Sequence, residues 1–181
     1  PTVFSSSWYD SYTRANLESY VGLSGRNKGP YRLLMGTWLH GDDTMVDTFA
    51  GEVDLGSEAP IDYNEARLRW FDRWLKEMRT GVDDDPPVHI FVMGGGDGRK
   101  NGEGRLNHGG RWRDEREWPL SRAHTTSLYL QPDGSLGPEP PKEKDSSTAY
   151  RFDPNDPVPT IGGNISSLST LRPIPSYVTD P

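Results

Sequence analysis

The distribution of apolar residues changes near residue 85, and the two halves of the chain point to different architectures. In residues 1–80, short apolar runs alternate with helical patterns. Tyr31–Gly36 is a short run typical of a buried parallel strand. A helix is predicted to begin at Asp62, because Asp62 and Glu65 have the spacing of a capping box. Strands that alternate with helices favour a parallel sheet, so this half is predicted to be α/β.

Two further elements complete the prediction for this half. Residues 1–4 are expected to be the end of a strand, and a short helix is expected around Leu17–Val21. The helix from Asp62 should end near Thr80. Its apolar residues recur at helical spacing and are expected to share one face: Tyr63, Trp70, Phe71, Trp74, Leu75 and Met78.

The second half is rich in turns. An acidic run followed by two prolines at 83–87 predicts a boundary between a domain of residues 1–85 and a domain of residues 86–181. Beyond it, strands are predicted at Val88–Met93 and Ser127–Leu130, with a long hairpin insertion over the glycine-rich residues 94–110. This composition is typical of a β-sandwich or barrel, and the few strands indicate an incomplete one.

Charge and composition exclude several partner classes. The formal net charge of −7 argues against a nucleic-acid partner, which calls for a basic face. No apolar run approaches the roughly 18 residues of a membrane span, so no membrane partner is expected. The chain contains no cysteine, which removes disulfides and cysteine-based metal sites. The compartment stays open, with the cytoplasm slightly favoured.

Asp10 and His40 are the candidate catalytic residues. Asp10 follows the first predicted strand, and His40 lies four residues after the strand Tyr31–Gly36. The carboxyl ends of neighbouring parallel strands lie at one edge of a sheet, where α/β proteins bind ligands. An aspartate that accepts a hydrogen bond from a histidine ring fixes the tautomer of the imidazole and prepares it to take a proton from a nucleophile.

These two residues would form two thirds of a Ser-Asp-His triad. The third member is missing, because the chain contains no Gly-x-Ser-x-Gly elbow; the nearest string, Gly22-Leu23-Ser24-Gly25, has the wrong spacing. Spacing alone favours the simpler interpretation that Asp10 is a turn residue and His40 a loop residue.

A resemblance to a known family favours the catalytic interpretation of Asp10 and His40 over the simpler one. The segments Trp8-Tyr9-Asp10 and Gly36-Thr37-Trp38-Leu39-His40-Gly41 resemble those that supply the triad aspartate and histidine in the cocaine-esterase-like branch of the X-Pro dipeptidyl-peptidase family of serine hydrolases. Further segments resemble the same family in the same order, over about residues 1–165: 69–75, 88–94, 112–120 and 153–163. The chain departs from the family at Thr37, where a proline is usual, and in lacking the serine elbow.

The resemblance implies a fragment of a serine hydrolase. Residues 1–85 would be the C-terminal portion of an α/β-hydrolase domain carrying Asp10 and His40, and residues 86–181 the start of a jelly-roll β-domain. The nucleophilic serine would lie upstream of this chain, so the fragment alone would be inactive or nearly so. The expected substrate is a small-molecule ester, an amide or a short peptide, with no cofactor or metal; homo-oligomer formation is left open.

Other interpretations remain beside it. Asp42, Asp43 and Asp47, and the run Asp83–Asp85, are acidic clusters, but neither follows a calcium-loop pattern and both are expected to be solvated. The alternative function is a non-catalytic β-sandwich binding module that holds carbohydrate through Trp112 or Trp118, although packing is the expected role of these rings. A third is a complete but degenerate protein that kept Asp10 and His40 by descent.

Overall fold

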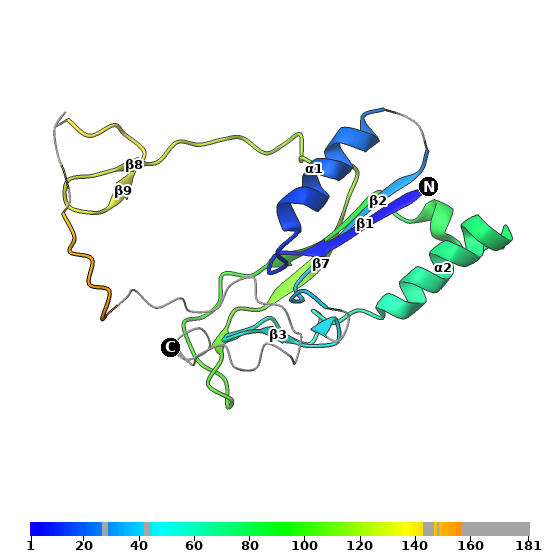
Figure 1. Cartoon of the computed structure of the whole chain (residues 1–181), viewed down its shortest axis with the longest axis horizontal. Helices are drawn as coiled ribbons and strands as arrows, with labels where there is room; N and C mark the ends of the chain where they lie inside the picture. The colour runs from blue at the N-terminus through cyan, green and yellow to red at the C-terminus, as the bar shows by residue number, and fades with distance from the viewer. Residues whose placement is uncertain (27–28, 42–43, 143–146, 148, 157–181) are drawn as a thin grey trace. The chain divides into compact units, whose positions relative to one another are not determined.

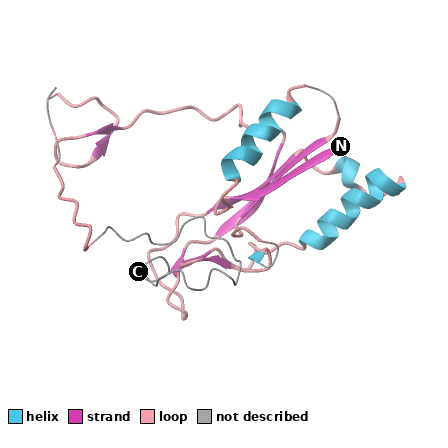
Figure 2. Ribbon diagram, viewed as in Figure 1, coloured by secondary structure: helices cyan, strands magenta, loops and turns pink. Residues whose placement is uncertain are grey.

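The structure is a computed structural model that describes residues 1–26, 29–41, 44–142, 147 and 149–156. The chain divides into two compact units (Figures 1 and 2). Residues 1–120 belong to the first unit and residues 121–159 to the second. Each unit is described by itself.

A four-stranded mixed sheet forms the centre of the first unit. Its strands are β1 (Thr2–Ser7), β2 (Tyr31–Gly36), β5 (Val88–Met93) and β7 (Gly110–Glu115), in the order β1-β2-β5-β7. β1, β2 and β5 are parallel, and β7 is antiparallel to β5. The predicted strands at 31–36 and 88–93 are confirmed, and the first strand extends to Ser7.

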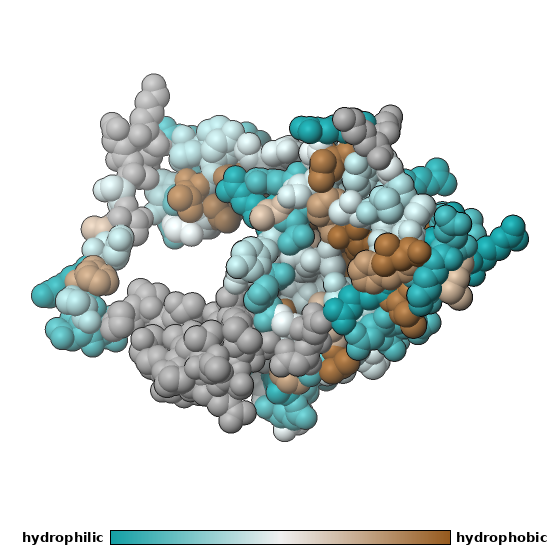
Figure 3. All heavy atoms as spheres, turned by 45° about the vertical axis from the view of Figure 1, so that its right-hand side comes forward, coloured by the Kyte–Doolittle hydropathy of each residue, from teal (hydrophilic) through white to brown (hydrophobic). Residues whose placement is uncertain are grey.

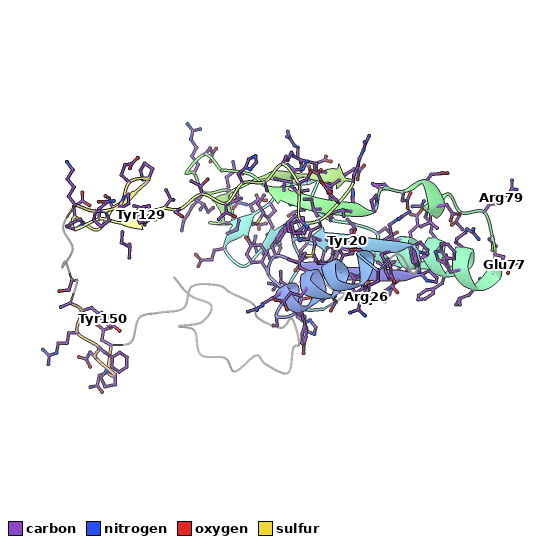
Figure 4. The ribbon with its side chains drawn as sticks, turned by 90° about the horizontal axis from the view of Figure 1, so that it is seen from above. Tyr20, Arg26, Glu77, Arg79, Tyr129 and Tyr150 are labelled. Atoms are coloured by element: carbon purple, nitrogen blue, oxygen red, sulfur yellow. The ribbon has the colours of Figure 1, made fainter. Side chains whose placement is uncertain are left out.

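Helix α1 (Thr13–Ser24) connects β1 to β2 and packs on one face of this sheet. Tyr20, labelled in Figure 4, is 4% exposed and meets Phe4 edge to face at 5.9 Å between ring centroids. The core on this face consists of six buried residues: Phe4, Tyr20, Leu33, Met35, Val88 and Ile90. Alternating side chains of three strands therefore share one apolar layer with α1.

Helix α2 (Tyr63–Lys76) begins as predicted, because the Asp62 carboxylate accepts a hydrogen bond from the Glu65 amide at 2.8 Å. The expected end near Thr80 is wrong: the helix ends at Lys76, and Glu77 adopts a left-handed conformation with φ of 57°.

Three of the six residues expected to share one face of α2 are exposed. Trp70 is buried, whereas the exposed fractions of Phe71, Leu75 and Met78 are 52%, 75% and 49%. The six residues span a wide arc, and Met78 lies beyond the end of the helix at Lys76. Figure 3 shows apolar residues among hydrophilic ones on the side of the molecule that comes forward in that view.

A small three-stranded sheet lies within the loops of the first unit. It contains β3 (Phe49–Ala50), β4 (Val53–Asp54) and β6 (Leu106–Asn107), none of which the sequence predicted. β6 belongs to the expected hairpin over 94–110, whose arms are joined by hydrogen bonds such as that from the Gly94 amide to the Gly109 carbonyl. A second apolar cluster, Ala50, Leu55, Ala59 and Phe91, connects this region to β5.

The second unit contains one short hairpin. β8 (Tyr129–Leu130) pairs with β9 (Leu136–Gly137) in antiparallel fashion. The strand expected over 127–130 is therefore shorter than predicted. The turn residue Asp133 accepts hydrogen bonds from the Ser135 hydroxyl and amide, and these bonds lower the pKa of its carboxyl group.

The fold as a whole consists of mixed sheets with few helices, and the described residues form no closed barrel. β5 is joined to β2, so the main sheet continues across residues 85–86; the acidic run contains a short 3₁₀ helix, η2 (Val82–Asp84). A division into domains at 85–86 and a jelly roll over 86–181 stay predictions. Residues 157–163 of the last resembling segment lie outside the described part. No helix in the described ranges is long and apolar enough to cross a membrane.

Candidate active site

The site lies where the two neighbouring parallel strands end. Ser7 of β1 is in register with Gly36 of β2, and the Trp8 amide donates to the Gly36 carbonyl at 3.0 Å. The segments that follow, 8–10 and 37–40, therefore leave the sheet at the same edge. This juxtaposition follows from the connection through α1, which returns the chain to a parallel strand.

The two candidate residues come together at this edge. The Nδ1 atom of His40 lies 3.1 Å from the Oδ1 atom of Asp10. Asp10 is 7% exposed, while the side chain of His40 is 45% exposed. The pair thus has a buried acidic partner and an imidazole that reaches solvent.

Three groups donate hydrogen bonds to the Asp10 carboxylate. Besides His40, the Tyr12 amide donates to Oδ1 at 3.0 Å, and the Ser6 hydroxyl donates to Oδ2 at 3.0 Å. The Thr13 hydroxyl lies within hydrogen-bonding distance of the carbonyl oxygens of Ser7 and Asp10, at 2.5 and 2.6 Å, which ties the start of α1 to the end of β1. The carboxylate is therefore held by backbone and side-chain contacts from both sides of the turn.

The loop that carries His40 is fixed by packing at its base. The Trp38 ring lies directly over Gly36, in space that a Cβ atom would occupy. The Ser7 hydroxyl donates to the Trp38 carbonyl. Farther along, the Leu39 amide donates to the Thr44 hydroxyl at 3.1 Å. Thr37 is 3% exposed, so this position is enclosed by the fold.

Two tyrosines flank the pair. The Tyr12 ring meets the His40 ring at 5.0 Å between centroids, with 61° between the planes. Burial raises the pKa of Tyr9, whose hydroxyl lies 3.5 Å from the Met93 sulfur, so this phenol stays neutral at physiological pH. Sequence reasoning missed Ser6 and Tyr12. The position of Ser6 four residues before Asp10 was the one available signal, and it is weak.

This arrangement is suited to proton transfer. When Nδ1 of His40 carries a proton, it donates to Asp10, and Nε2 then presents a lone pair able to accept a proton. A carboxylate in this position can also stabilise the imidazolium that such a transfer would form. The tautomer follows from the hydrogen-bonding partner at Nδ1.

The other sequence candidates have different surroundings. Asp83 and Asp85 form ion pairs with Arg73 and Arg69 of α2 at 2.5 and 3.1 Å. Asp42 and Asp43 lie outside the described residues. In the described part of the chain, no three His, Cys, Asp or Glu side chains are grouped so that they could hold a metal ion.

The two tryptophans proposed for carbohydrate binding are half-buried and pack against other rings. Trp112 stacks on His89 at 4.5 Å between ring centroids and meets Phe91 edge to face. Trp118 lies 6.1 Å from Trp8.

Comparison with known proteins identifies relatives of this chain. Residues 80–164 match the family described as the X-Pro dipeptidyl-peptidase C-terminal non-catalytic domain. A cocaine esterase of Rhodococcus sp. (strain MB1 Bresler) is 27% identical over 176 residues, which cover 91% of this chain and 27% of the esterase. Proteins of Mycobacterium bovis and Mycobacterium tuberculosis, both named provisionally as serine esterases, are each 29% identical over 149 residues, or 82% of this chain and 20% of theirs.

The proteins that this chain matches belong to one class, the serine hydrolases of esterase and peptidase type. Within that class, the chain is similar to the cocaine-esterase-like X-Pro dipeptidyl-peptidase family. It spans about a quarter of the length of the relatives it matches. Asp10 and His40 precede the region that matches the non-catalytic domain.

Proposed function

We propose that Asp10 and His40 are the acid and base members of a Ser-Asp-His triad in an esterase or peptidase, and that the serine comes from polypeptide outside these 181 residues. The observation that carries the proposal is the 3.1 Å contact between His40 Nδ1 and a buried carboxylate at the ends of two adjacent parallel strands. The absence of a serine elbow from the sequence is the reason for placing the nucleophile elsewhere.

The fold proposal follows from the same strands. We assign β1 and β2, with α1 and α2, to the C-terminal edge of an α/β-hydrolase sheet, and residues 86–181 to the start of a jelly-roll domain. The parallel pairing of β1 with β2 supports the first assignment. The match of residues 80–164 to a non-catalytic C-terminal domain supports a separate role for the second half.

The proposed mechanism uses each residue twice. Nε2 of His40 takes the proton from the serine hydroxyl as its oxygen attacks the substrate carbonyl carbon, and then gives that proton to the departing alcohol or amine. Water next loses a proton to His40 and attacks the acyl-enzyme, and the same proton returns to the serine oxygen as the acid leaves. Throughout both steps, Asp10 orients the ring and stabilises its cationic form.

The proposed substrates are esters, amides or short peptides of small size. The names of the relatives support this choice, since one is a cocaine esterase and the matched domain takes its name from an X-Pro dipeptidyl-peptidase. Both reactions share attack on a carbonyl carbon, so one triad serves both.

The test uses the complete polypeptide that contains this chain, assayed on an aryl ester and an aminoacyl amide. Asp10→Asn should lower kcat by about 10⁴-fold, because the wrong tautomer of His40 is then favoured. His40→Ala should cause a loss of at least this order. The control is His124→Gln, since His124 lies exposed in the second unit. Full activity in either Asp10→Asn or His40→Ala would refute the proposal.

A non-catalytic role for the second half is the alternative, and the description of the domain matched by residues 80–164 favours it. In that case, the isolated chain should bind oligosaccharides in calorimetry, and the complete polypeptide should show no hydrolysis that depends on His40. The half-buried packing of Trp112 and Trp118 weighs against a sugar platform made of these rings.

A further inference from the structure

Ser6 contacts the side of the Asp10 carboxylate that faces away from His40. Its hydroxyl lies 3.0 Å from Oδ2 of Asp10, whereas Oδ1 receives the His40 ring and the Tyr12 amide. Ser6 is 1% exposed and belongs to β1, which is held along its whole length by β2. The donor is therefore fixed by the sheet rather than by a mobile loop.

We propose that Ser6 is a positioning residue for the Asp10–His40 pair, an inference that rests on the proposed function of that pair. A carboxylate held through one oxygen can still turn about its Cβ–Cγ bond. A donor at the second oxygen fixes the plane of the group, so Oδ1 stays directed at Nδ1 of His40. Ser6 thereby selects the tautomer of His40 in which Nε2 accepts a proton.

The burial of Ser6 supports this role. A buried hydroxyl costs free energy unless it is hydrogen-bonded, and an apolar residue would suit the α1 face of β1 better, since Phe4 on the same face lies in the core. A hydrogen bond to a charged acceptor is stronger than one between neutral groups. The charged carboxylate of Asp10 therefore gives the buried Ser6 hydroxyl a stronger hydrogen bond than a neutral acceptor would.

The neighbouring serines provide matched controls. Ser5 and Ser7 alternate with Ser6 and point to the opposite face of the sheet. The Ser7 hydroxyl donates to the Trp38 carbonyl, while the Ser5 hydroxyl is buried and has no hydrogen-bond partner within the described residues. Ser5→Ala and Ser6→Ala therefore delete the same atom from adjacent positions, and only the second deletion removes a donor to Asp10.

The first experiment measures the tautomer of His40 in the 181-residue chain by ¹⁵N NMR of its histidine rings. The pH is set high enough for the imidazole rings to be neutral. The His40 signals are identified by their loss in His40→Gln. We expect the Nδ1–H form in the unmodified chain and in Ser5→Ala, and a shift toward the Nε2–H form in Ser6→Ala. Ser6→Thr, which keeps the hydroxyl, should restore the Nδ1–H form. If Ser6→Ala fails to fold, Ser6→Cys keeps the volume with a weaker donor and should shift the tautomer in the same direction.

The second experiment measures kinetics in the complete polypeptide. Ser6→Ala should lower kcat about 10- to 100-fold with little change in KM, as for other groups that orient a reacting side chain. Ser5→Ala should leave both constants unchanged. A merely structural role would lower the stability of Ser6→Ala without changing the tautomer or kcat.

The outcomes separate the two proposals. If Ser6→Ala has the tautomer of Ser5→Ala while Asp10→Asn abolishes hydrolysis, the inference about Ser6 is wrong and the triad stands. If Ser6→Ala shifts the tautomer while Asp10→Asn and His40→Ala hydrolyse esters normally, Ser6 positions the pair and the proposed function is wrong.

Discussion

The contact between Gly36 and Trp38 leads to a quantitative prediction about the loop that carries His40. A methyl group added at Gly36 would overlap the six-membered ring of Trp38. That ring is 3% exposed and lies within 6.5 Å of the Tyr63 and Trp112 rings, centroid to centroid, so it has little room to move. Gly36→Ala should therefore be strongly destabilising.

The magnitude follows from overpacking. An extra methyl group forced into a packed core lowers the free energy of unfolding by about 1–3 kcal/mol. Because Gly36→Ala would displace a buried tryptophan ring, we expect a loss at the upper end of that range. The matched variant is Gly22→Ala in α1, where an added Cβ atom meets nothing within 4 Å. There the same methyl should stabilise by about 0.5–1 kcal/mol, because alanine loses less backbone entropy in a helix.

The assay is urea unfolding of both variants and the unmodified chain. The free energy of unfolding of Gly36→Ala should lie about 2–4 kcal/mol below that of Gly22→Ala, with similar m-values. The Nδ1–H signal of His40 should also change in Gly36→Ala, since Trp38 is two residues from His40. A Gly36→Ala chain within 0.5 kcal/mol of the unmodified one would refute the reasoning that Trp38 fixes this loop.

Three further predictions concern stability. Asp62→Ala should lower the free energy of unfolding by about 0.5–2 kcal/mol through loss of the N-cap bond to Glu65, measured by urea unfolding; an unchanged midpoint would contradict this. Hydrogen bonds from the Gly56 amide and the Asn101 side chain lower the pKa of Asp54. The Asp54 carboxylate should therefore stabilise the fold fully above about pH 4, and this stabilisation should be lost as the pH falls through the lowered pKa. Asp54→Asn should lose less stability on acidification than the unmodified chain, and equal pH profiles of the two would contradict this prediction. Leu33→Ala should cost about 2–5 kcal/mol because Leu33 is 1% exposed, whereas Leu75→Ala at 75% exposure should stay within about 0.5 kcal/mol; similar thermal midpoints for the two would overturn the assigned core.

The sequence predicted those elements whose signal is local. The apolar runs of β2 and β5 and the N-cap at Asp62 each lie within a few residues, and the structure has them at the expected positions. The proximity of Asp10 to His40 followed from one general rule about parallel strands, applied across 30 residues.

Elements that depend on distant partners were missed. β7 (Gly110–Glu115) is polar in sequence and forms an outer strand of the sheet, where its Glu115 is buried beside Arg113 at 2.5 Å. The two-residue strands are too short to show any period. Ser6 was missed because a serine hydroxyl has many possible acceptors, and the turn after β1 decides which one it meets.

The acidic and proline-rich residues 83–87 separate two segments of different composition, yet the main sheet continues across them. The residues there form η2 and ion pairs with α2, and β5 then joins β2. Composition reports local backbone preferences, whereas strand pairing depends on which edge is available in three dimensions.

The order of strands in the main sheet also determines when its core is completed during synthesis. β1, α1 and β2 are local and occupy residues 2–36, but the strand that covers the other edge of β2 ends at residue 93. At about 5–20 residues per second, a ribosome needs on the order of 3–11 s to make the intervening chain. During that interval Leu33 and Met35 lack Val88 and Ile90, and the edge of β2 that β5 later covers has no partner strand from these residues.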